Sequence, residues 1–202
     1  MTTAFMADVR RWIEVDKGHS AMRRVFADSY GLQTLFAYRL GRWLLCAAHR
    51  YHLWPLLPVC WPVYFLLSRC AREAYDIRLE LSADIGPGFF IGHFGAIRVS
   101  HCRIGANCSI GQLTRIGAAA DGRGPVIGDR VWIGAHAQIV GPYRIGSDAT
   151  VGAGTVLQGD IPEGGVLCLG NPARLVRRNY DNRRMLRLSE EVQRLARNAA
   201  AS

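Results

Sequence analysis

Aliphatic residues recur every six positions through the middle of this 202-residue chain, a period that neither an α-helix nor a flat strand has. Most are followed by glycine, and a small residue usually lies two positions before each. A coil of three short straight edges has this period, because each edge sends one aliphatic side chain inward and glycine takes the tight corner. The repeat therefore predicts a solenoid of stacked coils around this aliphatic core: Ile85, Ile91, Ile97, Ile104, Ile110, Ile116, Ile127, Ile133, Ile139, Ile145, Val151 and Leu157.

Two breaks interrupt the repeat. One extra residue lies between Ile97 and Ile104, where we expect a bulged coil. Eleven positions separate Ile116 from Ile127, where we expect a loop.

The six cysteines indicate packing rather than chemistry. None forms a CxxC pair, so a disulfide scaffold or a zinc site is disfavoured and no metal is expected. Cys102 and Cys108 occupy small-residue positions of the repeat, which predicts that both fill the core.

The net charge of +9 is concentrated at the two ends of the chain. Residues 1–75 hold ten Lys and Arg against five acids, residues 76–170 seven against eight, and residues 171–202 eight against three. A neutral centre disfavours a nucleic-acid partner, whereas basic ends suit an anionic cofactor, anionic lipid or an acidic chain. Charged residues from Asp8 to Asp16 disfavour a signal peptide, so we expect a cytoplasmic location.

Both flanks of the repeat have apolar residues at helical spacing. One stripe comprises Leu32, Leu35, Phe36, Leu40, Trp43, Leu44 and Ala47, and a second comprises Met185, Leu188, Val192 and Leu195.

Residues 53–67 are almost wholly apolar but too short for a membrane-spanning helix, and three prolines interrupt them. Two interpretations stay open. The segment is a buried helical layer or subunit contact, or it rests on the inner membrane face with Trp54, Trp61 and Tyr64 as interfacial anchors.

Residues 84–178 resemble the hexapeptide-repeat acyltransferases, most specifically from Pro125 to Val176. GLQTLFAYRLGRWL (31–44) and FFIGHFGAIRVS (89–100) are most similar to the serine acetyltransferase branch. The resemblance implies a left-handed parallel β-helix over residues 77–176, between a helical N-terminal region (1–76) and a C-terminal helical tail (177–202). It also implies acetyl-CoA as the donor, and a homotrimer or a dimer of trimers.

The resemblance implies that His93 is the catalytic base, because it aligns with the histidine that takes the acceptor's proton in the serine branch. Such help is typically worth about 10² to 10⁴ in rate. An exposed corner histidine without a catalytic role is the alternative. His101, at the bulge, is a second candidate as a base or its partner, whereas His136 is favoured as a surface or subunit-contact residue.

Three positions depart from the serine branch. Gly92 stands where that branch has an aspartate, Arg78 where it has the aspartate that orients the base, and Gly124 where it has a histidine that handles serine. Glu80 and Asp84 are candidates to replace the orienting carboxylate.

For the donor, the resemblance implies that the pantetheine arm lies along Ala135 and Ala153, and that Arg174 and Arg177 meet its phosphates. Small side chains leave room for the arm, and guanidinium groups suit phosphate. The alternatives are ordinary corner alanines and an arginine-rich tail. Arg123 is expected to aid either donor or acceptor.

The sequence thus predicts an acetyl-CoA-dependent O-acetyltransferase with its active site between subunits. A saccharide hydroxyl on a surface-polysaccharide precursor is the favoured acceptor, and L-serine is the alternative. Two other classes stay open: a non-catalytic assembly protein, and a zinc hydratase, which needs three imidazoles at a spacing that His93, His101 and His136 do not offer.

Overall fold

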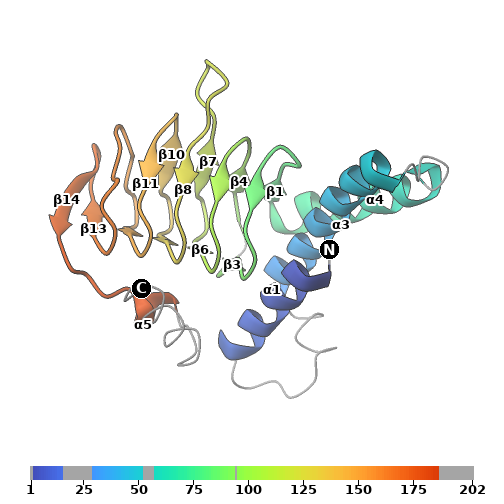
Figure 1. The fold of residues 1–202 in the computed structure, drawn as a ribbon, viewed down its shortest axis with the longest axis horizontal. Coiled ribbons are helices and arrows are strands. Elements are labelled where there is room, and N and C mark those ends of the chain that lie inside the picture. The colour runs from blue at the N-terminus through green and yellow to red at the C-terminus, as the bar shows by residue number, and fades with distance from the viewer. Residues whose placement is uncertain (1, 16–28, 52–56, 94, 187–202) are drawn as a thin grey trace.

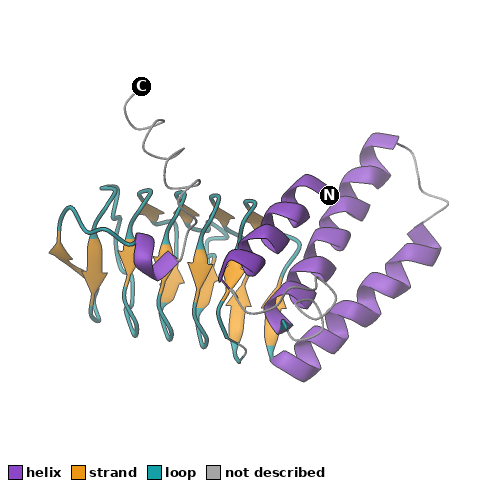
Figure 2. Cartoon of the chain, turned by 90° about the horizontal axis from the view of Figure 1, so that it is seen from below, coloured by secondary structure: helices purple, strands orange, loops and turns teal. Residues whose placement is uncertain are grey.

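The computed structural model describes residues 2–15, 29–51, 57–93 and 95–186. Three long helices lie at one end of a solenoid of short strands, as Figures 1 and 2 show. A short helix from the C-terminal segment lies against the side of the solenoid (Figure 2). The helices are α1 (Thr2–Val15), α3 (Tyr30–Tyr51), α4 (Leu57–Tyr75) and α5 (Arg183–Leu186).

The strands form three sheets, one along each edge of the coil. Sheet A contains β1 (Ile77–Leu79), β4 (Ile97–Val99), β7 (Arg115–Gly117) and β10 (Gln138–Val140). Sheet B contains β2 (Asp84–Ile85), β5 (Arg103–Ile104), β8 (Val126–Ile127) and β11 (Arg144–Ile145). Sheet C contains β3 (Phe90–Ile91), β6 (Ser109–Ile110), β9 (Trp132–Ile133), β12 (Thr150–Val151), β13 (Leu167–Leu169) and β14 (Arg174–Arg177).

The predicted β-helix with helices before and after it is confirmed, although Leu188, Val192 and Leu195 of the predicted C-terminal stripe lie outside the described residues. Strands in each sheet pair in parallel, apart from the antiparallel β13–β14 pair, so each turn of the coil contributes one strand to each sheet. All twelve predicted aliphatic residues are buried, each at most 4% exposed. Stacked turns satisfy one another's backbone groups, and the aliphatic side chains fill the space between the sheets.

The predicted bulge lies elsewhere than expected. In sheet A the residue level with Ile116 is Val99, not Ile97. The extra residues therefore belong to the corner that joins β3 to β4, which runs from Gly92 to Ala96. Ile97 and Val99 both face inward around exposed Arg98, so sequence periodicity could not decide which of them opposes Ile116. The corner where sheet C passes into sheet A, hereafter the C–A corner, is thus enlarged in the first turn.

The predicted loop follows β7 and rises above the solenoid in Figure 1. Within this loop the Arg123 Nε donates a hydrogen bond to a carboxylate oxygen of Asp121 at 2.7 Å.

Cys102 and Cys108 are buried, as expected for core-filling residues. Burial raises the pKa of both thiols to about 12, so each stays protonated at neutral pH. The thiol of Cys108 lies 3.2 Å from the carbonyl oxygen of Gly128.

A buried ion pair joins α1 and α3 to the first turn. Asp8 accepts hydrogen bonds from the Arg39 Nε and the Phe89 backbone N–H, each at 2.9 Å. Arg39 also donates to the carbonyls of Ile85 and Gly86. Burial raises the pKa of Asp8, and Arg39 opposes this effect. Asp8 is fully buried and Arg39 nearly so, and each charge therefore depends on the other.

Helix α3 itself approaches the first turn closely. A Cβ at Gly31 would lie 2.8 Å from the Cβ of Ile91, so only glycine permits this distance. Further along the helix, the Tyr38 hydroxyl donates to the carbonyl of Ala83 at 2.7 Å. These contacts fix the helices at the first turn of the solenoid.

Helix α4 packs against α3 and has four exposed apolar side chains: Trp61, Val63, Phe65 and Leu66. It contains Pro62. Residues 53–56 of the predicted apolar segment, including Trp54, lie outside the described residues. None of the helices in the described parts of the chain is long and apolar enough to cross a membrane.

Candidate active site

A groove with a volume of about 540 Å³ follows the C–A corner up the solenoid. Its walls come from sheet C, from successive turns of the corner and from α5. The lining residues are Phe90, Gly92, His93, Ser109, Ile110, Gly111, Gln112, Trp132, Ala135, Ala153, Arg184, Met185 and Leu186. This corner groove contains three of the five residues predicted for the site: His93, Ala135 and Ala153.

His93 lies in the enlarged corner of the first turn and is exposed. Gly95 and Ala96 follow it with positive φ angles of 106° and 44°, so the backbone turns sharply there before entering β4. Among the described residues, none forms a hydrogen bond or ion pair with the His93 imidazole. Its ring is therefore available to a ligand in the groove.

Ala135 and Ala153 lie on successive turns of the same corner. Their backbones are hydrogen-bonded, since the Gly154 N–H donates to the Ala135 carbonyl at 2.8 Å. A Cβ on Gly134 would lie 2.5 Å from the Ala153 nitrogen, which shows how closely the turns stack. The methyl groups leave an open strip above His93 that could hold a long, narrow ligand.

Arg174 and Arg177 lie outside the corner groove, on β14 at the far end of sheet C. Arg174 lines a smaller cavity of about 150 Å³. The arginine that lines the corner groove is Arg184 of α5. After β14 the chain returns along the solenoid, and Asn182 anchors it by donating to the Arg130 carbonyl at 2.9 Å. This return has no repeat in the sequence, so the position of Arg184 could not be predicted.

Arg11 of α1 is a buried residue behind the groove that the sequence did not reveal. It donates to the Gly88 carbonyl at 2.7 Å, to the Ser109 Oγ at 2.8 Å and to the Leu186 carbonyl at 3.2 Å. Burial lowers its pKa to about 10. Arg11 thus ties α1, the second turn and α5 together, and Ser109 and Leu186 are themselves part of the groove lining.

The other histidines lie elsewhere. His101 follows β4, at the corner between sheets A and B, and His136 is exposed beside Ala135 without lining the groove. Glu80 and Asp84 lie after β1 and on β2, and neither lines the groove.

The carboxylates proposed to orient the base have other partners. Asp84 pairs with Arg42 at 3.0 Å, and Glu80 accepts a hydrogen bond from Ser82. The acidic residue stacked beneath the C–A corner is Asp76, whose carbonyl accepts from the Ile97 N–H at 3.1 Å.

We expect Ala153→Phe to abolish binding of acetyl-CoA, because the ring would fill the strip above His93. Ala153 is exposed, so the thermal unfolding midpoint without ligand should stay within about a degree or two of the parent value. Gln158→Phe is a matched control, since Gln158 is exposed on a different corner. For both variants, donor binding is measured as the rise in the thermal unfolding midpoint when acetyl-CoA is added. An undiminished shift for Ala153→Phe would exclude the strip as the donor site.

Comparison with known proteins gives consistent matches. The family model for bacterial transferase hexapeptide (six repeats) matches residues 124–159. A serine acetyltransferase from Helicobacter pylori is 30% identical over 153 residues, 72% of this chain and 81% of its own length. One from Mycobacterium tuberculosis is 29% identical over 188 residues, 87% of this chain and 73% of its own length.

Solved structures have the same fold. Serine acetyltransferase from Vibrio cholerae superposes with a TM-score of 0.75 at 23% identity, covering 92% of this chain and 69% of its own. The Brucella abortus enzyme in complex with coenzyme A superposes with a TM-score of 0.72 at 22% identity, covering 88% of this chain and 68% of its own. Soybean serine acetyltransferase complexed with serine superposes with a TM-score of 0.69 at 30% identity, covering 86% of this chain and 68% of its own.

Proposed function

The chain belongs to the serine acetyltransferase family of hexapeptide-repeat acyltransferases, and we propose that it transfers the acetyl group of acetyl-CoA to an acceptor hydroxyl in the corner groove. The observation that carries this proposal is the presence of His93, Ala135 and Ala153 in one groove. A base and a narrow strip for a thioester are the two parts that acetyl transfer requires.

In this proposal the donor lies along the C–A corner, with its pantetheine arm over Ala135 and Ala153. Sheet C continues beyond β12 to β13 and β14, so Arg174 and Arg177 lie in line with the upper end of the arm. Arg184 borders the groove from α5. Guanidinium groups at these places suit the phosphates of coenzyme A.

His93 acts as the general base. Its imidazole takes the proton of the acceptor hydroxyl as the oxygen attacks the thioester carbonyl. The tetrahedral intermediate then collapses, the carbon–sulfur bond breaks, and the leaving thiolate takes the proton back from the imidazolium. The products are an acetyl ester and free coenzyme A, and the base is regenerated.

L-serine and a saccharide hydroxyl are the two candidate acceptors. The names of the relatives favour L-serine, and the soybean structure contains serine. A saccharide hydroxyl, the acceptor favoured by the sequence, has no support from the comparisons. It rests on Arg78, Gly92 and Gly124, where this chain departs from the serine branch.

The test is release of coenzyme A from acetyl-CoA by the purified chain, with L-serine or a hexose as acceptor. Turnover that saturates with serine assigns serine as the acceptor despite those departures. Turnover with the hexose alone assigns a saccharide. A chain that binds acetyl-CoA but releases no coenzyme A with any acceptor contradicts the proposed activity.

We further propose a homotrimer, or a dimer of trimers, with the groove completed by a neighbouring chain. Light scattering on the purified protein should give a mass of three or six chains. A fully active monomer would contradict this arrangement.

A peripheral contact with the membrane is also part of the proposal. Trp61, Phe65 and Leu66 expose apolar surface on α4, close to Arg69, which is itself exposed. Interfacial aromatic residues beside cations suit anionic lipid. We expect the chain to co-sediment with phosphatidylglycerol-containing vesicles, and Phe65→Ser with Leu66→Ser to reduce this binding severalfold. Equal recovery in the supernatant with and without vesicles would contradict it.

A further inference from the structure

Three arginines on sheet A stack in register. Arg78 pairs with Arg98 across β1 and β4, and Arg98 pairs with Arg115 across β4 and β7. Neighbouring strands lie about 4.8 Å apart, so this arginine column places three guanidinium groups on one face of the sheet. All three side chains are exposed. Like charges opposite one another destabilise a sheet.

Acidic side chains offset this charge at the lower end of the column, where Asp76 and Glu80 lie two residues before and after Arg78. Within the described residues, Arg98 and Arg115 form no ion pair, and Arg78 has one long contact of 3.9 Å with Asp76. Sheet B differs, since Asp84 on β2 lies 3.7 Å from Arg103 on the adjacent strand. The positive charge of the column is therefore least balanced at Arg98 and Arg115, where a bound anion would offset it.

The column flanks the catalytic end of the corner groove. The C–A corner carries His93 in the first turn and leads directly into β4 and Arg98. In the second turn, Gln112 lines the groove and Arg115 follows on β7. The column ends there, because the next residue in register is Gln138. Positive charge on sheet A is thus limited to the turns nearest His93.

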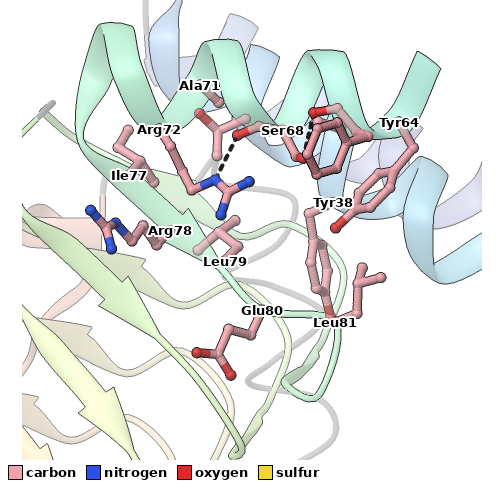
Figure 3. Close-up of a pocket in the computed structure, with 13 residues that line it drawn as sticks. Tyr38, Tyr64, Ser68, Ala71, Arg72, Ile77, Arg78, Leu79, Glu80 and Leu81 are labelled. Atoms are coloured by element: carbon pink, nitrogen blue, oxygen red, sulfur yellow. Dashed lines mark hydrogen bonds between the residues drawn. The ribbon is translucent and has the colours of Figure 1, made fainter. Parts of the chain in front are cut away.

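The lower end of the column opens into a second cavity, of about 350 Å³, between α3, α4 and β1 (Figure 3). Arg78 and Arg72 both line it, together with Tyr64 and Ser68. The remaining walls are mostly apolar, apart from Glu80 next to β1. This cavity offers space and a fourth guanidinium beyond the column itself.

We propose that the arginine column binds a diphosphate group of the acceptor, and that the reacting hydroxyl belongs to a sugar attached to this diphosphate. The inference rests on the proposed acetyl transfer and names its substrate class. Guanidinium groups bind phosphate oxygens in a bidentate manner, and two adjacent phosphates match two adjacent arginines of the column. The single carboxylate of serine would occupy one arginine and leave the others unbalanced.

A diphosphate of this kind occurs in nucleotide-linked and in lipid-linked sugars. Both kinds of sugar present the same diphosphate to the column. They differ in the group attached to it, a nucleoside or a lipid chain, which would lie in the second cavity or along the exposed side chains of α4. Binding of UDP and of farnesyl diphosphate in phosphatidylcholine vesicles separates these two sources.

The test is calorimetric binding of inorganic pyrophosphate to the full chain, with saturating coenzyme A present so that the donor site is occupied. We expect Arg98→Gln and Arg115→Gln each to weaken binding about tenfold or more, with a steep dependence on salt. Arg144→Gln is the matched control, because Arg144 is exposed on sheet B and forms no ion pair within the described residues. It should bind pyrophosphate like the parent chain.

Three results would overturn the inference: no pyrophosphate binding, equal loss in Arg144→Gln, or a changed oligomer mass in the column variants with unchanged binding. The last would make the column a contact between copies of this chain. The thermal unfolding midpoint with and without acetyl-CoA, measured separately, distinguishes a failure of the diphosphate inference from a failure of the proposed acetyl transfer. If acetyl-CoA stabilises the chain but pyrophosphate does not bind, the diphosphate inference alone fails. If acetyl-CoA also has no effect, the proposed function fails.

Discussion

His93→Gln is expected to lower kcat for acetyl transfer by about 10² to 10⁴, because glutamine cannot take the proton of the acceptor hydroxyl. The side chain is exposed and, among the residues described, has no partner, so the fold should be unaffected. Acetyl-CoA should still raise the thermal unfolding midpoint of the variant as it does for the parent chain. The loss therefore belongs in kcat rather than in donor binding.

His136→Gln is the control for this variant. His136 is exposed on the same corner, two turns above His93, but does not line the groove. The activity of His136→Gln should equal that of the parent chain. Full activity in His93→Gln, or equal losses in both variants, would remove His93 from the mechanism.

Asp8→Ala is expected to lower the free energy of unfolding by about 3–5 kcal/mol, the usual result of removing one partner from a buried ion pair. The change leaves Arg39 buried without a carboxylate and the Phe89 N–H without its acceptor. Urea unfolding followed by circular dichroism measures this loss. Because Asp8 lies outside the groove, residual activity should track the folded fraction.

Asp84→Ala provides the comparison. Asp84 pairs with Arg42, but both side chains are partly exposed, so the loss should be about 1 kcal/mol or less. The double variant Asp8→Leu, Arg39→Met should recover part of the stability, since it leaves no unpaired buried charge. Equal losses for Asp8→Ala and Asp84→Ala would contradict the role of the buried pair.

The solenoid could be predicted because its repeat follows from backbone geometry. An edge of the coil has a fixed length, so inward positions such as Ile133, Ile139 and Ile145 recur every six residues, and Ile133 stacks in register with Val151 one turn later. The small positions, including Cys108, are equally constrained by the space left inside the coil. Ala135 and Ala153 were singled out by the resemblance to the acyltransferases, and both line the corner groove.

Other features depend on contacts that no periodicity encodes. The register of β4 decides that the enlarged corner is the one that carries His93. Arg11 reaches Ser109 and Leu186 only because α1 folds back against the solenoid. The arginine column likewise becomes visible only once strand pairing aligns Arg98 with Arg115.

The most direct test of the central claim is mass spectrometry of the acceptor after incubation with acetyl-CoA and the purified chain. L-serine, a free hexose and a diphosphate-linked hexose are compared, and released coenzyme A is measured in parallel. The account predicts an O-acetylated acceptor with equimolar coenzyme A, and neither product with His93→Gln. If acetyl-CoA stabilises the chain but no acceptor is acetylated and no coenzyme A is released, the solenoid binds its ligand without catalysis, and the account is contradicted.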